Sequence, residues 1–418
     1  MSTLARRLVA RGHDVVFISV PDAEPLVRST QLPFVPYCEK EYPIGSTRQI
    51  LNQLSKLEGQ EALAFTNRAV ADTLDAAFKD LAQTLCKTRT DAVVLDTVQT
   101  PLGLVPMHLD MPYVHVSNSL HLDFSGHTPI NTFDWSHDTS PETLARNKEG
   151  VRKYRQMMEP KISVARAYAK QIGLEIDWTD PLVGISKLAW LTQTPKEFDF
   201  QSSHWPPQFH HTGPFHDGRG RSDPDFPWKR LTGEPLIYAS MGTLQNGFET
   251  VFSTIAEAVG TRPGMQLVLS IGPVLDPKQI RSLPANSIVV NRAPQIELLK
   301  RSALCITHAG LNTTLESLTQ GVPMVAIPVT NDQPGVAARI AHTKTGAFVP
   351  LKELTAPRLS SLIDDVLTNP EYGQHACNMR QAIAETNGLE RAADLLEQVF
   401  DLRAPVIPND GLFSPRAG

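Results

Sequence analysis

The sequence predicts an α/β protein built from two doubly wound domains, and three observations lead to this prediction. Short apolar stretches typical of buried parallel strands alternate with longer helical patterns through most of the 418 residues. A stretch dense in glycine, proline, aspartate and arginine, residues 216–230, divides this alternation into two halves. A chain of this length exceeds what one hydrophobic core usually holds, so each half is expected to form its own domain.

Composition narrows the class of protein. Hydrophobic residues make up 41% and charged residues 20%, so a packed core is expected and general disorder is excluded. The net charge of −5 argues against a nucleic-acid partner. Apolar runs such as 322–329 are far shorter than the roughly 20 residues that span a bilayer. The four cysteines have no ligand spacing, which predicts reduced, mostly buried thiols and a cytoplasmic location: Cys38, Cys86, Cys305 and Cys377.

The chain opens on an amphipathic helix and not on a strand. Residues 1–13 carry Leu4, Leu8 and Val9 on one expected face, and a buried strand follows at 14–20. Open α/β sheets normally begin with a strand whose loop precedes the first helix. The pattern therefore predicts that the first strand and its loop are missing from this chain. A fold that simply begins with a helix is the alternative.

The remainder of the first half alternates between helices and strands. We expect helices over 47–57, 61–85 and 141–172, and strands over 91–96 and 112–117. Between them, residues 118–140 are rich in histidine, aspartate, proline and aromatic residues, and a loop of this length is usually functional or disordered. Its aromatic residues suit either an apolar ligand pocket or packing of the loop on its own domain: Phe124, Phe133 and Trp135.

The second half repeats the alternation from residue 236. Strands are expected at 236–240, 266–271, 287–291, 304–307 and 323–328, helices at 251–259, 294–301, 313–320 and 335–341, and three further helices end near 402. The predicted organisation is an N-terminal domain 1–215, a linker 216–230, a C-terminal domain 231–402 whose final helix packs back on the first domain, and a mobile tail 403–418.

The turn after strand 304–307 is a candidate anion site. His308 and the small or hydroxyl residues up to Thr313 leave backbone N–H groups facing outward at the start of a helix, where the helix dipole favours an anion. Glu316 could accept hydrogen bonds from ribose hydroxyls, and Asp332–Gln333 suits sugar hydroxyls. Alternatively, Asn312 or Thr313 is an ordinary N-cap and Glu316 completes a capping box.

Taken together, these motifs resemble a known family. The run from Gln295 through HAGLNTTLESLTQGVPMVAIPV (308–329) to Asp332 and Gln333 resembles the nucleotide-sugar signature of family 1 glycosyltransferases, including bacterial zeaxanthin and macrolide-type enzymes. YASMGT (238–243) resembles the first phosphate loop of the same family's C-terminal domain. The resemblance implies a GT-B fold, with a nucleotide-sugar donor in the C-terminal domain and an acceptor in the N-terminal domain.

The resemblance also implies roles for individual residues. Arg292 and Gln295 would contact the nucleobase, although plant members carry a tryptophan where Arg292 stands; a guanidinium can also stack on a base. Glu316 would bind the ribose. The donor-binding set implied by the resemblance is Thr243, Arg292, Gln295, His308, Gly310, Asn312, Thr313, Glu316, Asp332 and Gln333.

For catalysis, the resemblance implies an inverting reaction without a metal, in which a histidine deprotonates the acceptor hydroxyl and an aspartate orients that histidine. The aspartate corresponds to Asp96, at the carboxyl end of strand 91–96. The histidine would precede the first helix, where this chain has Met1, and His13 is an improbable replacement. The possible substitutes are His108, His115, His121 and His127.

Two other patterns could suggest a metal, but neither is strong. Asp223-Pro-Asp225 matches a metal–diphosphate motif, yet it lies in the predicted linker. His204, His210 and His211 have no helical pairing and no expected carboxylate partner, so no metal site is predicted.

The predicted function is transfer of a hexose, expected to be glucose, from a UDP-sugar to a hydroxyl of a small, fairly apolar acceptor, without a cofactor. We expect no nucleic-acid partner and only weak membrane association through an apolar acceptor. Two alternatives remain: a nucleotide-sugar epimerase on the same fold, and a non-catalytic nucleotide-sugar-binding protein.

Overall fold

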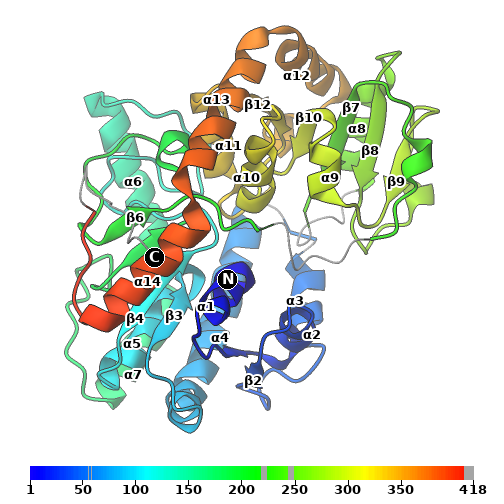
Figure 1. The fold of residues 1–418 in the computed structure, drawn as a ribbon. Helices are drawn as coiled ribbons and strands as arrows, with labels where there is room; N and C mark the ends of the chain where they lie inside the picture. The colour runs from blue at the N-terminus through cyan, green and yellow to red at the C-terminus, as the bar shows by residue number, and fades with distance from the viewer. Residues whose placement is uncertain (55, 58, 218–223, 243–248, 409–418) are drawn as a thin grey trace.

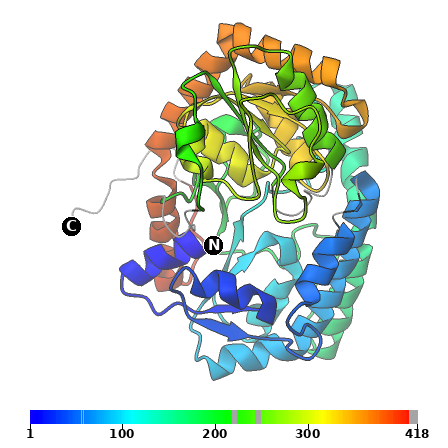
Figure 2. The same cartoon turned by 90° about the vertical axis from the view of Figure 1, so that its right-hand side faces the viewer.

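The computed structural model describes residues 1–54, 56–57, 59–217, 224–242 and 249–408. These residues form two lobes stacked on each other, each with parallel strands covered by helices (Figures 1 and 2). The N-terminal half of the chain builds one lobe and most of the C-terminal half builds the other. The predicted α/β architecture with two Rossmann-like domains is therefore confirmed.

The sheet of the N-terminal lobe is in two parts. Four parallel strands pair in the order β3–β4–β5–β6, and a separate parallel pair joins β1 to β2. Their bounds are β1 Phe17–Ser19, β2 Phe34–Pro36, β3 Val93–Asp96, β4 Tyr113–Ser117, β5 Trp190–Thr192 and β6 Phe209–His211. Among the described residues β1 and β3 are not paired with each other. The expectation that a first strand is missing stays a prediction.

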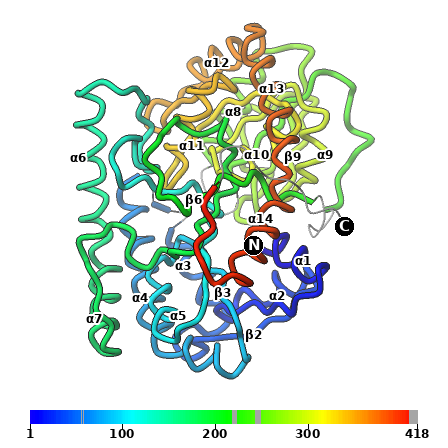
Figure 3. Tube along the Cα trace, turned by 60° about the vertical axis from the view of Figure 1, so that its left-hand side comes forward, coloured from blue at the N-terminus to red at the C-terminus, as the bar shows by residue number. Residues whose placement is uncertain are grey.

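Helices cover both parts of this sheet. They are α1 Ser2–Ala10, α2 Glu24–Arg28, α3 Ser46–Leu54, α4 Gly59–Lys87, α5 Leu104–His108, α6 Pro141–Met157 and α7 Glu159–Gln171. A 3-10 segment, η2 Thr97–Gly103, follows β3 directly. Helices α6 and α7 run along one side of the lobe (Figure 3), and α7 packs on α4 with the rings of Phe78 and Tyr168 stacked 4.1 Å apart.

The first helix buries a narrower face than predicted. Leu4 is buried, but Val9 is 44% exposed. In an α-helix a separation of five residues turns the side chain about 140° away, so Leu4 and Val9 cannot share one face. The assignment of Val9 to the buried face was therefore wrong.

The sheet of the C-terminal lobe has six parallel strands in the order β12–β11–β10–β7–β8–β9. The strands are β7 Leu236–Ser240, β8 Gln266–Ser270, β9 Ile288–Val290, β10 Ser302–Thr307, β11 Met324–Ala326 and β12 Gly346–Phe348; the helices are α8 Glu249–Gly260, α9 Gln295–Leu299, α10 Leu311–Thr319, α11 Gln333–His342 and α12 Ala356–Thr368. Strands β10 and β7 are neighbours at the centre of the sheet. From β7 the chain continues to β8 on one side of this pair, and from β10 it continues to β11 on the other side. Ligands bind in the crevice at such a reversal, at the carboxyl ends of the strands.

The last two helices connect the lobes. Helix α13 (Pro370–Thr386) packs on α10 in the C-terminal lobe, and α14 (Gly388–Leu402) descends onto the N-terminal lobe beside α1 (Figure 1). Gly388, where α14 begins, lies against the backbone of Gly213, and a Cβ atom on Gly388 would lie 2.5 Å from that backbone. This close approach requires glycine at position 388. Buried side chains of α14 join the core formed by α1, β4 and β5: Ala392, Leu395, Leu396 and Val399 against Leu4, Val114, Val116 and Leu191.

Two further sequence expectations concern the cysteines and the membrane. Cys38 and Cys305 are buried, but Cys86 and Cys377 are exposed, so the expectation of mostly buried thiols holds for only half of them. Within the described residues every helix is too short or too polar to span a bilayer.

The packing of α14 predicts a large stability effect at Leu396. Replacing this fully buried side chain by alanine removes apolar contacts and leaves a cavity, so Leu396→Ala should lower the free energy of unfolding by about 2–5 kcal/mol in a urea titration. Leu402 ends the same helix with 60% of its surface exposed, and Leu402→Ala should have little effect. Equal losses in the two variants would contradict this account of the packing.

Candidate active site

The topological reversal brings two glycine-containing loops together around His308. Gly242, after β7, has a φ of +75°, and a Cβ atom on it would lie 2.5 Å from the His308 ring. A Cβ atom on Gly310 would lie 2.4 Å from Nε2 of the same ring. Both positions therefore need glycine to make room for the imidazole. Burial lowers the pKa of His308 to about 4, so the ring is neutral at pH 7 and can donate one N–H. Thr243 lies outside the described residues.

Helix α10 begins without a side-chain cap. Its N-cap is Gly310, and no side chain in the described part of the chain accepts a hydrogen bond from its first turn. The capping-box alternative for Asn312, Thr313 and Glu316 is therefore wrong. The first-turn amides of a helix have no partner within the helix, and together with the dipole they favour an anion.

One turn further along α10, a polar group forms between two elements. Gln295, at the start of α9, donates from Nε2 to Oε2 of Glu316 at 2.6 Å and to the Thr313 hydroxyl at 3.4 Å. The Tyr238 hydroxyl donates to Oε1 of Gln295 at 3.0 Å. His216 lies with Nε2 at 3.9 Å from Oε1 of Glu316. Three residues predicted to bind the nucleotide sugar are thus neighbours: Gln295, Thr313 and Glu316. The sequence analysis did not identify Tyr238 and His216 as members of this group.

Arg292 is placed differently from this group. It is exposed just after β9 and before α9. A side chain there is free to reach a base, but no described interaction orients it.

The two residues predicted to bind the sugar lie at the start of α11. Asp332 accepts at Oδ2 from the backbone N–H of Leu120, in the other lobe, at 2.8 Å, and burial raises the pKa of its carboxyl. Gln333 accepts at Oε1 from the amides of Val329 and Thr330 at 2.8 and 3.0 Å. Because its carbonyl is used to hold the turn, the Gln333 amide nitrogen is left to donate elsewhere, and no described residue accepts from it.

Asp96 faces this region from the N-terminal lobe. Its Oδ1 accepts from the backbone N–H of Val98 at 2.9 Å, and its Oδ2 accepts from Nδ2 of Asn118 at 2.6 Å. Gln193 then donates from Nε2 both to the Asn118 carbonyl at 2.7 Å and to Oδ1 of Asn312 at 2.9 Å. A hydrogen-bonded path therefore runs from Asp96 across the interface to the first turn of α10.

Asn118 and Gln193 were missed from the sequence. Both lie directly after a strand, Asn118 after β4 and Gln193 after β5, at the carboxyl edge where ligands bind. The position of Asn118 after a predicted strand was a usable signal. Gln193 gave none, because β5 has only three residues.

A large cavity opens beside this edge in the N-terminal lobe. Its volume is about 760 Å³, and Thr97, Leu120 and Asp332 lie among its lining residues. The rest of the wall comes mainly from α4, α6, α7 and the loops that follow them, with many apolar side chains. Phe124 lines the cavity. Phe133 and Trp135 instead stack on each other at 4.0 Å and pack against Gly150 of α6. The expectation of an apolar pocket therefore holds for Phe124, and the expectation of packing on the same domain holds for Phe133 and Trp135.

Comparisons with known proteins agree with this geometry. Residues 186–385 match the family model described as UDP-glucoronosyl and UDP-glucosyl transferase. A zeaxanthin glucosyltransferase from Pantoea ananas is 28% identical over 417 residues, covering 98% of this chain and 95% of its own. Among solved structures, the glycotransferase of kitacinnamycin superposes with a TM-score of 0.72 at 24% identity, covering 95% of this chain and 94% of its own. Glycosyltransferase VinC, in complex with dTDP, superposes with a TM-score of 0.66 at 17% identity, covering 96% of each chain.

The chain is therefore similar to the UDP-glycosyltransferase family, whose model matches residues 186–385. It is a glycosyltransferase of GT-B fold, and the reaction of this family is transfer of a sugar from a nucleotide sugar.

The histidines of this glycosyltransferase do not gather at Asp96. His108 is exposed at the end of α5; His115 lies in the core of β4, accepts from the Ser186 amide at 3.1 Å, and has its pKa lowered to about 3 by burial. His127 stacks on His204 at 3.3 Å, and His13 lies 2.9 Å from Glu397. Among the described residues no imidazole is hydrogen-bonded to Asp96.

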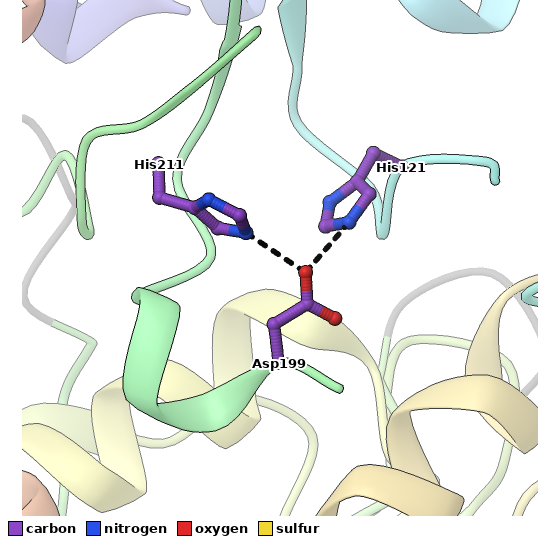
Figure 4. A group of neighbouring side chains, drawn as sticks. All are labelled: His121, Asp199 and His211. Atoms are coloured by element: carbon purple, nitrogen blue, oxygen red, sulfur yellow. Dashed lines mark hydrogen bonds and ion pairs between the residues drawn. The ribbon is translucent and has the colours of Figure 1, made fainter. Parts of the chain in front are cut away.

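His121, the fourth candidate, belongs to a buried charge cluster (Figure 4). Nε2 of His121 and of His211 lie 2.9 and 2.8 Å from Oδ2 of Asp199. The other carboxylate oxygen accepts from Nε of Arg339 at 2.7 Å. Burial alone would raise the pKa of Asp199, but the charges of His121 and Arg339 hold it well below its usual range. Since Arg339 lies on α11, the cluster joins the N-terminal lobe of the glycosyltransferase to the helix that begins at Asp332.

The cluster shows that one detail of the sequence interpretation was wrong, because His211 does have a carboxylate partner. Two imidazoles and a carboxylate can ligate a transition metal. Here, however, the guanidinium of Arg339 already neutralises the same carboxylate, and both histidines approach it at hydrogen-bond distance. The Asp199 carboxylate therefore serves Arg339 as its counter-ion, and the expectation of no metal stays a prediction.

Removing the charge of Asp199 should destabilise this glycosyltransferase strongly. Asp199→Asn leaves Arg339 buried without a counter-ion, so the free energy of unfolding should fall by about 3–5 kcal/mol in urea titration. Asp75 pairs with Lys79 on the exposed surface of α4, and Asp75→Asn is the matched control with a change below about 1 kcal/mol. A small loss for Asp199→Asn would mean that the cluster does not hold the lobes together.

Proposed function

We propose that this glycosyltransferase moves glucose from UDP-glucose to a hydroxyl of a small, fairly apolar acceptor, with inversion at the anomeric carbon. The observation that carries the proposal is the position of Asp332. It begins the helix predicted to bind the donor sugar, and it lines the 760 Å³ cavity of the opposite lobe. A sugar held there would meet an acceptor in the cavity.

The residues around α10 support binding of a nucleoside diphosphate. The uncapped first turn and the neutral His308 ring offer N–H donors to a diphosphate without a metal ion. Glu316 and Gln295 offer acceptors and donors to a ribose and a base. UDP is preferred over dTDP on family likeness.

The cavity favours transfer over the epimerase alternative. An epimerase acts on the nucleotide sugar alone and needs no second pocket, whereas this cavity has the volume of a site for a drug-sized molecule. Its apolar walls suit an apolar acceptor body.

In the proposed reaction, the acceptor oxygen attacks the anomeric carbon of glucose while the bond to the UDP oxygen breaks. Asp96, oriented by Asn118 and the Val98 amide, assists removal of the proton from the acceptor hydroxyl. Negative charge that develops on the leaving diphosphate is stabilised by the N–H donors of the α10 turn.

The direct test is an assay with UDP-glucose and a panel of hydroxylated aromatic and terpenoid acceptors, with and without EDTA. We expect a β-glucoside, identified by the anomeric NMR coupling, at a rate that EDTA leaves unchanged. An isomerised UDP-sugar in the absence of acceptor would favour the epimerase. Donor binding by calorimetry without transfer or hydrolysis would favour a binding protein.

A variant in β3 tests the role of Asp96, and a variant just before the same strand serves as its control. Asp96→Asn should lower kcat by about 100-fold or more, since general-base assistance contributes about 10²–10⁴-fold. Asp91 is exposed at the amino-terminal side of the same strand, and Asp91→Asn should retain the wild-type rate. If Asp96→Asn keeps its rate as well, the assigned role of Asp96 is wrong.

Glu316 provides a separate prediction for donor binding. Glu316→Gln replaces a charged acceptor by a neutral amide, and loss of a charge-assisted hydrogen bond of about 1.5–3 kcal/mol should weaken UDP binding roughly 10- to 100-fold in calorimetry. Glu297 pairs with Lys300 on the exposed side of α9 and offers the control Glu297→Gln. Unchanged UDP affinity in Glu316→Gln would place the ribose elsewhere.

A further inference from the structure

A buried lysine with no counter-ion among the described residues lines the large cavity. Lys161, near the start of α7, is only 6% exposed. No described residue forms a hydrogen bond or an ion pair with its ammonium group. Burial lowers the pKa of Lys161 to about 8, so the group still carries its charge at neutral pH. A buried charge normally has a partner, because an isolated one is costly to remove from water.

The charges along the cavity wall show that Lys161 is part of a positive region. Among the described residues, five basic and three acidic side chains line the cavity: Lys148, Arg152, Arg155, Lys161 and Arg166 against Glu159, Asp180 and Asp332. Arg152 is paired with Glu149 at 2.6 Å. Two of the acids are already paired, Glu159 with Arg166 at 3.2 Å and Asp180 with Lys187 at 3.2 Å. Asp332 accepts from the Leu120 amide at the opposite lobe's edge. No described acid forms an ion pair with the Lys161 ammonium group.

Asn67 provides a second, independent observation. It lies on α4, the helix on which α7 packs, and it also lines the cavity. Its side chain is 2% exposed, and its Nδ2 group has no hydrogen-bond partner in the described part of the chain. Two neighbouring helices thus each place in the wall of this cavity a buried polar side chain whose nitrogen has no partner among the described residues.

We propose that the acceptor carries a carboxylate on its apolar body, and that this carboxylate pairs with Lys161 and accepts from Nδ2 of Asn67. The inference rests on the proposed function, because it assigns the cavity to the acceptor. Pairing a desolvated ammonium with a carboxylate is a charge-assisted interaction, which is stronger than a neutral hydrogen bond. The lysine would therefore select acids over uncharged analogues of the same shape.

The test compares hydroxy acids with their methyl esters, which keep the shape and remove the charge. The probes are 4-hydroxycinnamate, 6-hydroxy-2-naphthoate and 12-hydroxydodecanoate, each with its ester. Binding is measured by calorimetry in the presence of UDP, and transfer is measured separately with UDP-glucose. The variants are Lys161→Met, and Lys170→Met at an exposed position of the same helix as the control.

We expect wild type and Lys170→Met to bind at least one acid about 10-fold or more tightly than its ester, the change that 1.4 kcal/mol produces. In Lys161→Met the preference should fall below about 2-fold, while UDP affinity is unchanged. Because methionine removes a desolvated charge, Lys161→Met should also unfold at a higher temperature than wild type, which shows that it folds.

The inference is overturned if wild type binds acids and esters equally, if it binds none of the acids, or if the preference survives in Lys161→Met. Its failure is distinct from failure of the proposed function. Equal transfer of glucose to acids and esters would remove only the role of Lys161. Selective binding of acids without any transfer would remove the proposed function and leave the anion site.

Discussion

The active site depends on the buried ion pair between Asp199 and Arg339, which joins the two lobes. The carboxylate comes from the N-terminal lobe and accepts from Arg339 on α11, the helix whose first residues are predicted to bind the sugar. Two more contacts act at the same end of α11: Leu120 donates to Asp332, and the Gly335 amide donates to the Asn131 carbonyl at 2.9 Å. A Cβ atom on Gly335 would lie 2.5 Å from that carbonyl, so the lobes approach here as closely as a glycine allows.

This closed arrangement explains how residues from two domains serve one reaction. Asp96 and the cavity belong to one sheet edge, and His308, Glu316 and Asp332 belong to the other. The hydrogen-bonded path through Asn118, Gln193 and Asn312 connects the two edges. Its members are neutral amides, which fix positions without adding charge beside a diphosphate. The charges of Asp199 and Arg339 compensate each other inside the buried cluster.

The sequence predicted those parts of the site that are local. The strand, turn and helix around His308 follow one another along the chain, so their residue types and spacing are visible without a structure. Gln295 and Glu316 are 21 residues apart, and only the family resemblance brought them together. The cluster of His121, Asp199 and Arg339 was not foreseeable, because its members come from a loop, a 3-10 flank and a helix in different lobes.

Short elements and tertiary burial account for the other misses. Strands β2, β5, β6 and β12 have only three residues each, too few for a period to show. Lys161 looks like a solvated residue at the start of a helix. Its burial arises only because α7 packs on α4 beside the cavity.

The central claim is that the α10 turn and the start of α11 hold a nucleotide sugar between the lobes. A crystal structure of the chain with UDP bound tests it most directly. The account predicts pyrophosphate oxygens within hydrogen-bond distance of the His308 ring and of amides in the first turn of α10, with the ribose at Glu316 and the base near Gln295. UDP bound at any other surface, with the α10 turn left unliganded, would contradict it.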